Sequence, residues 1–260
     1  MSDRPQARPG GRGAYDLTGR VAVVTGGSSG IGAATCVRLA AAGAIVWVGY
    51  NNGADRAAAL AAKLDGAGHR PVYLPMTDSA AIAAAAAAVR AAHGRVDVLV
   101  NSAGKTRAVP HGDLEAMDDA TFDDILITNA RGPFATIRAF RALLTASGDA
   151  VVINISSLAA LNGMGSSIAY CASKAALDVI GMSLGRVLGP EIRVIGISPA
   201  AVATDFVPGR GRAVVEAQAA GSPLRTVAEA DDVAVAVMAA VTGLRLTTGS
   251  TIVVDGGRHL

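Results

Sequence analysis

Residues 21–32 read Val21-Ala22-Val23-Val24-Thr25-Gly26-Gly27-Ser28-Ser29-Gly30-Ile31-Gly32, and an alanine-rich run at residues 33–42 follows directly. The five leading residues have no polar alternation, which predicts a strand buried on both faces. The glycines predict a tight turn, where free N–H groups and the positive end of the next helix can hold a pyrophosphate. A purely structural turn is the alternative, but its position in the first βα unit favours cofactor binding.

Six further apolar runs continue this pattern and alternate with longer alanine-rich helical segments. Together with the first, the predicted strands are residues 21–25, 44–49, 72–74, 96–101, 150–156, 193–198 and 251–254. Strands that alternate with helices predict a parallel sheet whose two faces are both covered. The expected fold class is therefore α/β, a single-domain, Rossmann-like, doubly wound parallel seven-stranded sheet with helices on both faces.

The composition excludes several classes of protein. The 260 residues are 51% apolar and 17% charged, which is enough for a well-buried core. A formal net charge of +2 provides no basic face for nucleic acid, and the longest uncharged apolar runs fall short of the roughly 20 residues of a membrane span. Cys36 and Cys171 have no disulfide or metal-ligand spacing, which indicates a reducing, cytoplasmic setting, and the histidines form no ligand pair, so no metal is expected.

Two segments depart from the regular pattern. Residues 1–15 lack the apolar core of a signal peptide and predict a flexible tail before a dinucleotide-binding catalytic domain at residues 16–260. Residues 206–226 are rich in proline and glycine and follow the sixth strand, where an open parallel sheet binds its ligands, so they predict a lid. Arg210, Arg212 and Arg225 near this lid attract an acidic substrate or are solvated loop charges, and the second interpretation is favoured.

Several motifs occur in a characteristic order. Gly26, Gly30 and Gly32 have the spacing G-x-x-x-G-x-G, which differs from the common G-x-G-x-x-G fingerprint. Further motifs are Asn101-Ser102-Ala103-Gly104, Asn129, Ser157, Tyr170-Cys171-Ala172-Ser173-Lys174 and the turn at residues 199–204. With these motifs, residues 17–257 resemble the short-chain dehydrogenase/reductase family, and in particular its NADP-dependent 3-oxoacyl reductase-like members. The resemblance implies a small-molecule carbonyl or alcohol substrate and a homotetramer.

Tyr170 and Lys174 are four residues apart on a predicted helix, so their side chains share one face. A nearby ammonium favours tyrosinate and lowers the pKa of tyrosine from about 10 toward the range of an acid/base catalyst. An incidental pair on a surface helix is the alternative. Because the chain has only three lysines, a lysine at this offset is improbable by chance.

The resemblance implies a role for each catalytic candidate. Tyr170 donates a proton to the substrate carbonyl oxygen as the nicotinamide delivers hydride, and Lys174 also binds the nicotinamide ribose. Ser157 lies thirteen residues before Tyr170, and this offset favours it over Ser156 as the serine that hydrogen-bonds the carbonyl oxygen. Ser156 then has a structural or cofactor-side role. Asn129 holds a water that links the lysine to solvent, with a helix-kinking amide as the alternative.

The end of the second strand decides the predicted cofactor. NAD-dependent members of the family carry an aspartate there, and Tyr50 occupies that position. Without a carboxylate to repel a 2′-phosphate, NADP is favoured over NAD, with Asn51, Asn52 and Arg56 as its expected partners. Met76 replaces an adenine-contacting aspartate and offers only backbone contact. The full set of expected cofactor residues is Gly26, Ser28, Ser29, Gly30, Ile31, Gly32, Tyr50, Asn51, Asn52, Met76, Asn101, Ala103, Gly104, Tyr170, Lys174, Pro199, Val202 and Thr204.

Three functions follow from this pattern. The first is an oxidoreductase that uses NADP(H) to reduce a ketone or a 3-oxoacyl group. The second is an NAD-dependent alcohol dehydrogenase of the same family, and the third is a cofactor-binding sensor or scaffold without turnover. The complete set Asn129, Ser157, Tyr170 and Lys174 argues against the third, because a pure binder needs no proton-transfer group.

Overall fold

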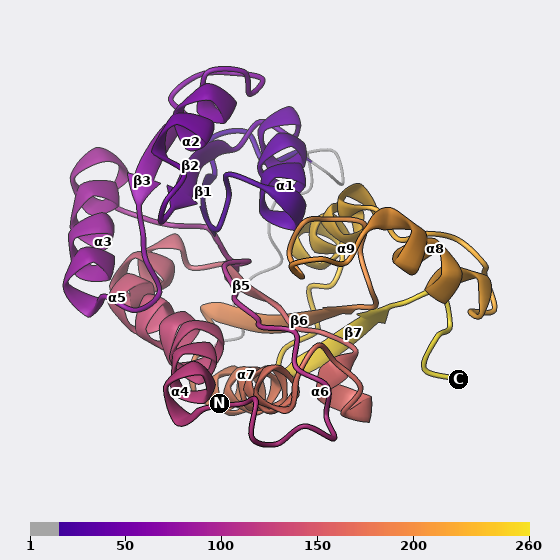
Figure 1. Cartoon of the computed structure of the whole chain (residues 1–260). Coiled ribbons are helices and arrows are strands. Elements are labelled where there is room, and N and C mark those ends of the chain that lie inside the picture. The colour runs from indigo at the N-terminus through magenta and orange to yellow at the C-terminus, as the bar shows by residue number, and fades with distance from the viewer. Residues whose placement is uncertain (1–15) are drawn as a thin grey trace, which may run out of the picture.

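The computed structural model describes residues 16–260, so the predicted tail at residues 1–15 lies outside the described residues. The described chain forms a seven-stranded sheet in which all neighbouring strands are parallel (Figure 1). The strands are β1 (Val21–Thr25), β2 (Ile45–Tyr50), β3 (Arg70–Tyr73), β4 (Val98–Asn101), β5 (Ala150–Ile155), β6 (Ile192–Pro199) and β7 (Ser250–Val254). The seven predicted strands are confirmed, with ends that differ by at most two residues.

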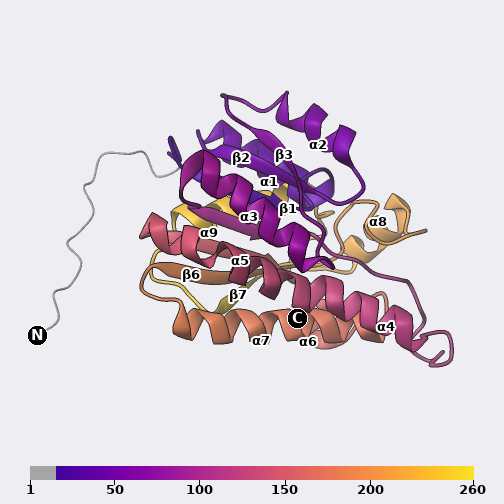
Figure 2. The same ribbon diagram turned by 90° about the vertical axis from the view of Figure 1, so that its left-hand side faces the viewer.

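Helices cover the sheet on both faces, as predicted (Figures 1 and 2). They are α1 (Gly30–Ala41), α2 (Ala54–Ala61), α3 (Ser79–His93), α4 (Asp119–Leu126), the π-helix η1 (Ile127–Arg131), α5 (Gly132–Ser147), α6 (Ala159–Asn162), α7 (Ile168–Val187), α8 (Arg212–Ala220) and α9 (Ala230–Thr242). Helices α1, α2 and α9 pack against one face of the sheet, and α3, α5 and α7 pack against the other. The chain therefore has the three layers of a doubly wound fold.

The burial of β1 shows why the strands lack polar alternation. Ala22 and Val24 pack in the core on the α1 side, whereas Val21 and Val23 pack in the core on the α3 side. Because successive side chains of a strand point to opposite faces, a strand covered on both faces needs apolar residues at every position. The continuous apolar runs are the direct sequence signal of this sandwiched sheet.

The strand order β3-β2-β1-β4-β5-β6-β7 reverses direction between β1 and β4. At this point the chain leaves β1 toward one side of the sheet and β4 toward the other, which opens a crevice at the carboxyl ends. Thr25 at the end of β1 joins the two strands across the crevice, because its hydroxyl oxygen accepts hydrogen bonds from the backbone N–H groups of Ser102 (3.1 Å) and Ala103 (3.0 Å). The fold therefore places the glycine turn and the segment after β4 side by side.

The predicted lid at residues 206–226 contains a helix that the sequence analysis did not anticipate. Helix α8 occupies Arg212–Ala220, and Figure 1 shows it beyond the carboxyl ends of β6 and β7. Most residues of α8 are good helix formers, and the glycines that suggested a loop, Gly211 and Gly221, lie at its two caps. The segment is therefore a short helix between two turns.

Candidate active site

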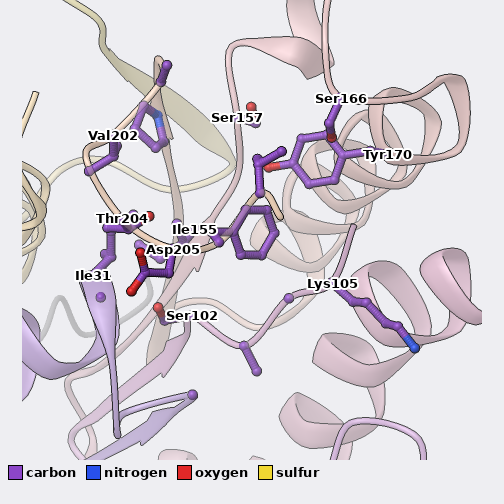
Figure 3. A pocket seen from close by; sticks show the side chains of 18 of the residues that line it. Ile31, Ser102, Lys105, Ile155, Ser157, Ser166, Tyr170, Val202, Thr204 and Asp205 are labelled. Carbon is purple, nitrogen blue, oxygen red and sulfur yellow. The ribbon is translucent and has the colours of Figure 1, made fainter. Parts of the chain in front are cut away.

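A cavity of about 1360 Å³ opens at the carboxyl ends of the strands. It is lined by the glycine turn, the segments after β2, β4, β5 and β6, and one face of α7. Figure 3 shows a part of the cavity in which Ser157 and Tyr170 lie on one side and Ile31, Thr204 and Asp205 on the other. Sites for single drug-sized ligands usually measure about 300–1,000 Å³, so this cavity has room for a dinucleotide together with a substrate.

The backbone of the glycine turn forms a concave surface, and side chains at its glycine positions would fill it. A Cβ on Gly26, whose φ is +63°, would lie 2.8 Å from the Cα of Ala103, and one on Gly32 would lie 2.3 Å from the carbonyl oxygen of Gly26. The N-cap of α1, Ser29, makes no side-chain capping bond, so the first N–H groups of α1 have no partner from it. This is the arrangement that binds a phosphate at a helix N-terminus, and the residues present fit a dinucleotide.

The far end of the cavity, beyond β2, is polar and contains a guanidinium. Asn51, Asn52 and Arg56 line it. A Cβ on Gly53 would lie 2.6 Å from Nη2 of Arg56 and 3.1 Å from Oγ of Ser28, so the arginine side chain folds back toward the glycine turn. This places its positive charge beside the residues expected to meet the adenosine ribose.

Three of the expected cofactor residues do not line the cavity. Gly32 packs directly against Gly26, and Tyr50 packs against Tyr73 with their ring centroids 5.8 Å apart. Asn101 is buried, and its Nδ2 donates a hydrogen bond to Oδ1 of Asn154 at 2.9 Å. These residues support the walls of the cavity. The other expected cofactor residues line it directly: Gly26, Ser28, Ser29, Gly30, Ile31, Asn51, Asn52, Met76, Ala103, Gly104, Tyr170, Lys174, Pro199, Val202 and Thr204.

Met76 and the turn after β6 complete the lining. The side chain of Met76 is buried against Gly132 of α5, as expected for a residue that offers only its backbone to a ligand. The turn after β6 brings Cγ2 of Thr204 within 3.5 Å of a Cβ on Gly30, so it closes over the glycine turn. Ala200, which stands where the family usually has glycine, does not adopt a positive φ, so alanine fits there without strain.

Tyr170, the candidate acid/base group, is half-buried in the wall of the cavity. Burial raises the pKa of its hydroxyl to about 12, while a hydrogen bond with Ser157 and the positive charge of Arg210 act in the opposite direction. Ser157 follows β5, where its hydroxyl oxygen accepts a hydrogen bond from the N–H of Ala159 at 3.2 Å. The neighbouring Ser156 is buried, and its hydroxyl interacts with the carboxylate of Asp178 on α7. Tyr170 is therefore fully protonated near neutral pH.

Lys174 lines the same cavity as Tyr170, four residues further along α7. Its Nζ donates a hydrogen bond to the carbonyl oxygen of Ile155 at 2.7 Å and lies 5.8 Å from the centroid of the Tyr170 ring. Burial lowers the pKa of Lys174 to about 8, and the nearby carboxylate of Asp178 partly offsets this. For Tyr170, burial is the largest influence on the pKa, and the positive charge that opposes it is that of Arg210. The expected effect of the Lys174 ammonium on the Tyr170 pKa stays a prediction.

Asn129 lies in the π-helix η1, between α4 and α5. Its side chain accepts a hydrogen bond from the N–H of Lys105 at 2.8 Å and donates to the carbonyl oxygen of Lys105 at 2.8 Å and to Oγ of Ser173 at 3.0 Å. A Cβ on Gly104 would lie 3.4 Å from Oδ1 of Asn129 and 3.7 Å from Nζ of Lys174. Asn129 therefore ties the segment after β4 to α7 next to the lysine, and π-helical turns are frequent at functional sites.

Two residues of the predicted lid reach the centre of the site. The ring of Phe206 is tilted against that of Tyr170 with centroids 5.8 Å apart, and its Cε2 would lie 3.5 Å from a Cβ on Gly104. Arg210 lines the same cavity and acts electrostatically on Tyr170. The sequence analysis gave Phe206 no role, and for Arg210 it favoured a solvated loop charge over a contact with an acidic substrate. The available signal was their position two and six residues after Thr204.

The described residues show neither a membrane-spanning helix nor a metal centre. Within residues 16–260, no helix combines the length and the apolar character needed to cross a bilayer. No group of three histidine, cysteine, aspartate or glutamate side chains in this range is arranged to hold a metal ion.

Known proteins resemble this chain over nearly its whole length. The family model described as short chain dehydrogenase matches residues 20–213. A D-threitol dehydrogenase from Mycolicibacterium smegmatis is 37% identical, covering 94% of each chain. The 3-oxoacyl-acyl-carrier-protein reductase of Escherichia coli is 34% identical over 94% of this chain and 99% of its own. A crystal structure of a dehydrogenase/reductase from Sinorhizobium meliloti has a TM-score of 0.85 and 37% identity over 95% of this chain and 98% of that one.

Proposed function

The chain belongs to the short-chain dehydrogenase family of oxidoreductases, which act on CH–OH groups, and on this premise we propose that it uses NADPH to reduce a ketone or a 3-oxoacyl group. The observation that carries the proposal is the position of Tyr170 beside Ser157 (Figure 3), in the same cavity as the glycine turn that can hold a phosphate. A reductase needs an acid that holds its proton until the substrate oxygen becomes basic. Tyr170 meets this requirement at neutral pH.

Each residue of the site has a distinct role in the proposed carbonyl reduction. Ser157 donates a hydrogen bond to the substrate oxygen, where negative charge develops, and Tyr170 transfers the proton from its Oη to that oxygen. Lys174 would bind the ribose next to the nicotinamide, and Asn129 holds the segment after β4 beside Lys174 through two hydrogen bonds to the backbone of Lys105. When bound, the reduced nicotinamide supplies the hydride. The protein contributes position, burial and a proton at a defined atom.

Alcohol oxidation, the activity named for the D-threitol dehydrogenase relative, runs the same steps in reverse. It requires tyrosinate as the proton acceptor, and burial of Tyr170 makes that form costly. A sensor without turnover would have no use for a proton donor at this position.

The proposed preference for NADP rests on the residues beyond β2. The strand ends in Tyr50, Asn51 and Asn52, none of which carries a negative charge, and Arg56 adds a positive charge to the same end of the cavity. A 2′-phosphate gains charge-assisted hydrogen bonds there, and no carboxylate in this stretch repels it.

Arg56→Ala is expected to lower kcat/KM for NADPH by about 5- to 20-fold, because one charge-assisted contact to the phosphate is lost. The value for NADH is expected to stay within about twofold, since NADH lacks that phosphate. Steady-state kinetics with both cofactors measures the two values. Arg90→Ala, on the exposed face of α3, is the matched control. A wild-type enzyme that already prefers NADH would contradict the assignment.

The single experiment that tests the function is a cofactor titration followed by a carbonyl panel. Fluorescence titration with NADPH and NADH measures binding, and absorbance at the NADPH band measures turnover of simple ketones and of 3-oxoacyl thioesters. We expect NADPH to bind more tightly and at least one carbonyl class to be reduced. Cofactor binding without turnover across the panel would instead indicate a sensor.

The outer face of α7 supports a further part of the proposal, that the protein is a homotetramer. In the single chain, Val179, Met182 and Val187 are 58%, 48% and 68% exposed. Contiguous apolar surface of this kind usually marks a protein interface. The two cysteines are free and buried, which fits the reducing, cytoplasmic setting that we propose for the assembly.

Light scattering at micromolar concentration is expected to give a mass near four times the 25.9 kDa of one chain. Val179→Arg is expected to reduce this mass, because a charge in a buried interface is costly. Val37→Arg, at an equally exposed valine on α1, is expected to leave it unchanged. A wild-type mass of one chain would refute the tetramer.

A further inference from the structure

Arg210 stands apart from the other arginines of the lid because its guanidinium is turned into the active-site cavity. It follows a turn closed by a hydrogen bond from its own N–H to the carbonyl oxygen of Val207 at 3.1 Å. Its Nη2 donates to the carbonyl oxygen of Val202 at 3.2 Å. These two bonds hold the backbone and the guanidinium of Arg210 to the segment after β6, so the guanidinium has a defined position in the cavity that Tyr170 also lines.

The neighbouring arginine of the lid has a different environment. Arg212 is exposed and forms ion pairs with Glu216 (3.0 Å) and Glu229 (2.6 Å), which neutralise it outside the cavity. For Arg210, burial lowers the pKa, and the ionisable group that acts against this is the Tyr170 phenol rather than a carboxylate. The charge of Arg210 therefore faces the site without an acidic partner among the described residues.

Arg210 also has an unused donor. Its Nε is buried and finds no hydrogen-bond acceptor among residues 16–260. A buried N–H of a charged group without an acceptor is costly, so the guanidinium gains from an anion that approaches its Nη donors from the cavity. The two Nη groups of a guanidinium form a fork that matches the two oxygens of a carboxylate.

The other charged groups near Tyr170 already have partners or lie further away. Lys174, whose Nζ lies 5.8 Å from the centroid of the Tyr170 ring, donates a hydrogen bond to the carbonyl oxygen of Ile155. Lys105 is ion-paired with Asp124. Asp205 lies with Thr204 and Ile31, across the cavity from the Tyr170 ring (Figure 3). Arg258 lines the outer cavity and donates from Nη1 to the carbonyl oxygen of Gln218 at 2.6 Å. An anion next to Tyr170 therefore meets a positive charge and no adjacent carboxylate.

We propose that Arg210 binds a carboxylate carried by the substrate next to its reacting carbonyl or one carbon further away, so that the substrate is a 2-oxo or 3-oxo acid. This inference rests on the proposed function, because the reduction places the reacting carbonyl at Tyr170 and Ser157. Among the carbonyl compounds that the site can reduce, a carboxylate contact with Arg210 would favour free oxo acids over their neutral esters and thioesters. Arg210 contacts the substrate in this proposal and is a specificity residue.

The test compares oxo acids with their methyl esters. The probes are 2-oxopentanoate, 3-oxopentanoate and the two methyl esters, which keep the carbon skeleton of each acid, lack its charge and add one methyl group. For wild type, kcat/KM is expected to be about 10- to 100-fold higher for at least one acid than for its ester, the range of one charge-assisted contact. Arg210→Gln is expected to remove this preference, and Arg212→Gln, the matched control, to retain it.

The ratio of acid to ester separates binding from an effect on Tyr170. If Arg210 acts only by lowering the pKa of Tyr170 or by shaping the lid, Arg210→Gln lowers kcat/KM for acid and ester alike, and the ratio does not move. That result, or a wild-type enzyme that does not distinguish acid from ester, overturns the inference while the reductase assignment stands.

A binding measurement keeps the inference testable without turnover. In the Tyr170→Phe variant loaded with NADPH, calorimetry is expected to show tighter binding of the oxo acid than of its ester. Adding Arg210→Gln is expected to remove the difference. If this preference appears while wild type reduces none of the probes, the proposed reduction fails and the carboxylate site stands. Equal binding of acid and ester overturns the site.

Discussion

Tyr170→Phe lowers kcat by at least about a thousandfold, within the range that general acid catalysis contributes, and leaves NADPH affinity within about twofold. The substitution removes only the hydroxyl that carries the transferred proton. The aromatic ring stays in place against Phe206, so the shape of the cavity is kept. Single-turnover kinetics measures the loss of the chemical step, and fluorescence titration measures the retained cofactor affinity.

Tyr73→Phe is the control for this variant, because Tyr73 is 49% exposed on β3 and does not line the cavity. It is expected to retain wild-type kinetics. More than a tenth of wild-type kcat in Tyr170→Phe would show that another group donates the proton, and the mechanism given above would then be wrong.

Lys174→Met is expected to remove nearly all turnover, weaken NADPH binding and stabilise the fold. Lys174 is almost fully buried, and burial lowers its pKa from 10.5 to about 8. At 1.36 kcal/mol per pKa unit, the charged lysine costs folding about 3 kcal/mol at neutral pH. Methionine removes that cost and keeps an unbranched chain, but it leaves the carbonyl oxygen of Ile155 without a donor, which costs about 1 kcal/mol.

The stability difference between Lys174→Met and wild type is expected to depend on pH. A base whose pKa is lowered in the folded state destabilises the fold below about pH 8, and this penalty shrinks as pH rises toward 10.5. Thermal melts at pH 7 are therefore expected to show Lys174→Met above wild type by several degrees, and melts at pH 10 a much smaller gap. Lys63→Met, at an exposed lysine, is the control. A variant less stable than wild type at pH 7 would contradict the account of the buried charge.

The fold was predictable from the sequence because its signals are local. An apolar run of strand length without alternation, such as β1, indicates a strand covered on both faces, and Gly26 and Gly32 mark positions where no side chain fits. Helix α8 was missed for the opposite reason. Its flanking glycines and prolines are common to loops and to helix ends, and the local pattern does not distinguish the two.

For the candidate site, the sequence by itself determined which groups stand at offsets set by one element: Tyr170 and Lys174 on α7, and Ser157 at the end of β5. The tertiary structure decided which of these groups act on one another. It turned Lys174 toward Ile155, packed Phe206 against Tyr170, and placed Arg210 at the phenol from a segment forty residues further along the chain. Helical and strand periods fix relations within a few residues, whereas burial and charge depend on every segment that packs around the same point. That is why the catalytic pair was readable in the sequence, and why its pKa values and its arginine partner were not.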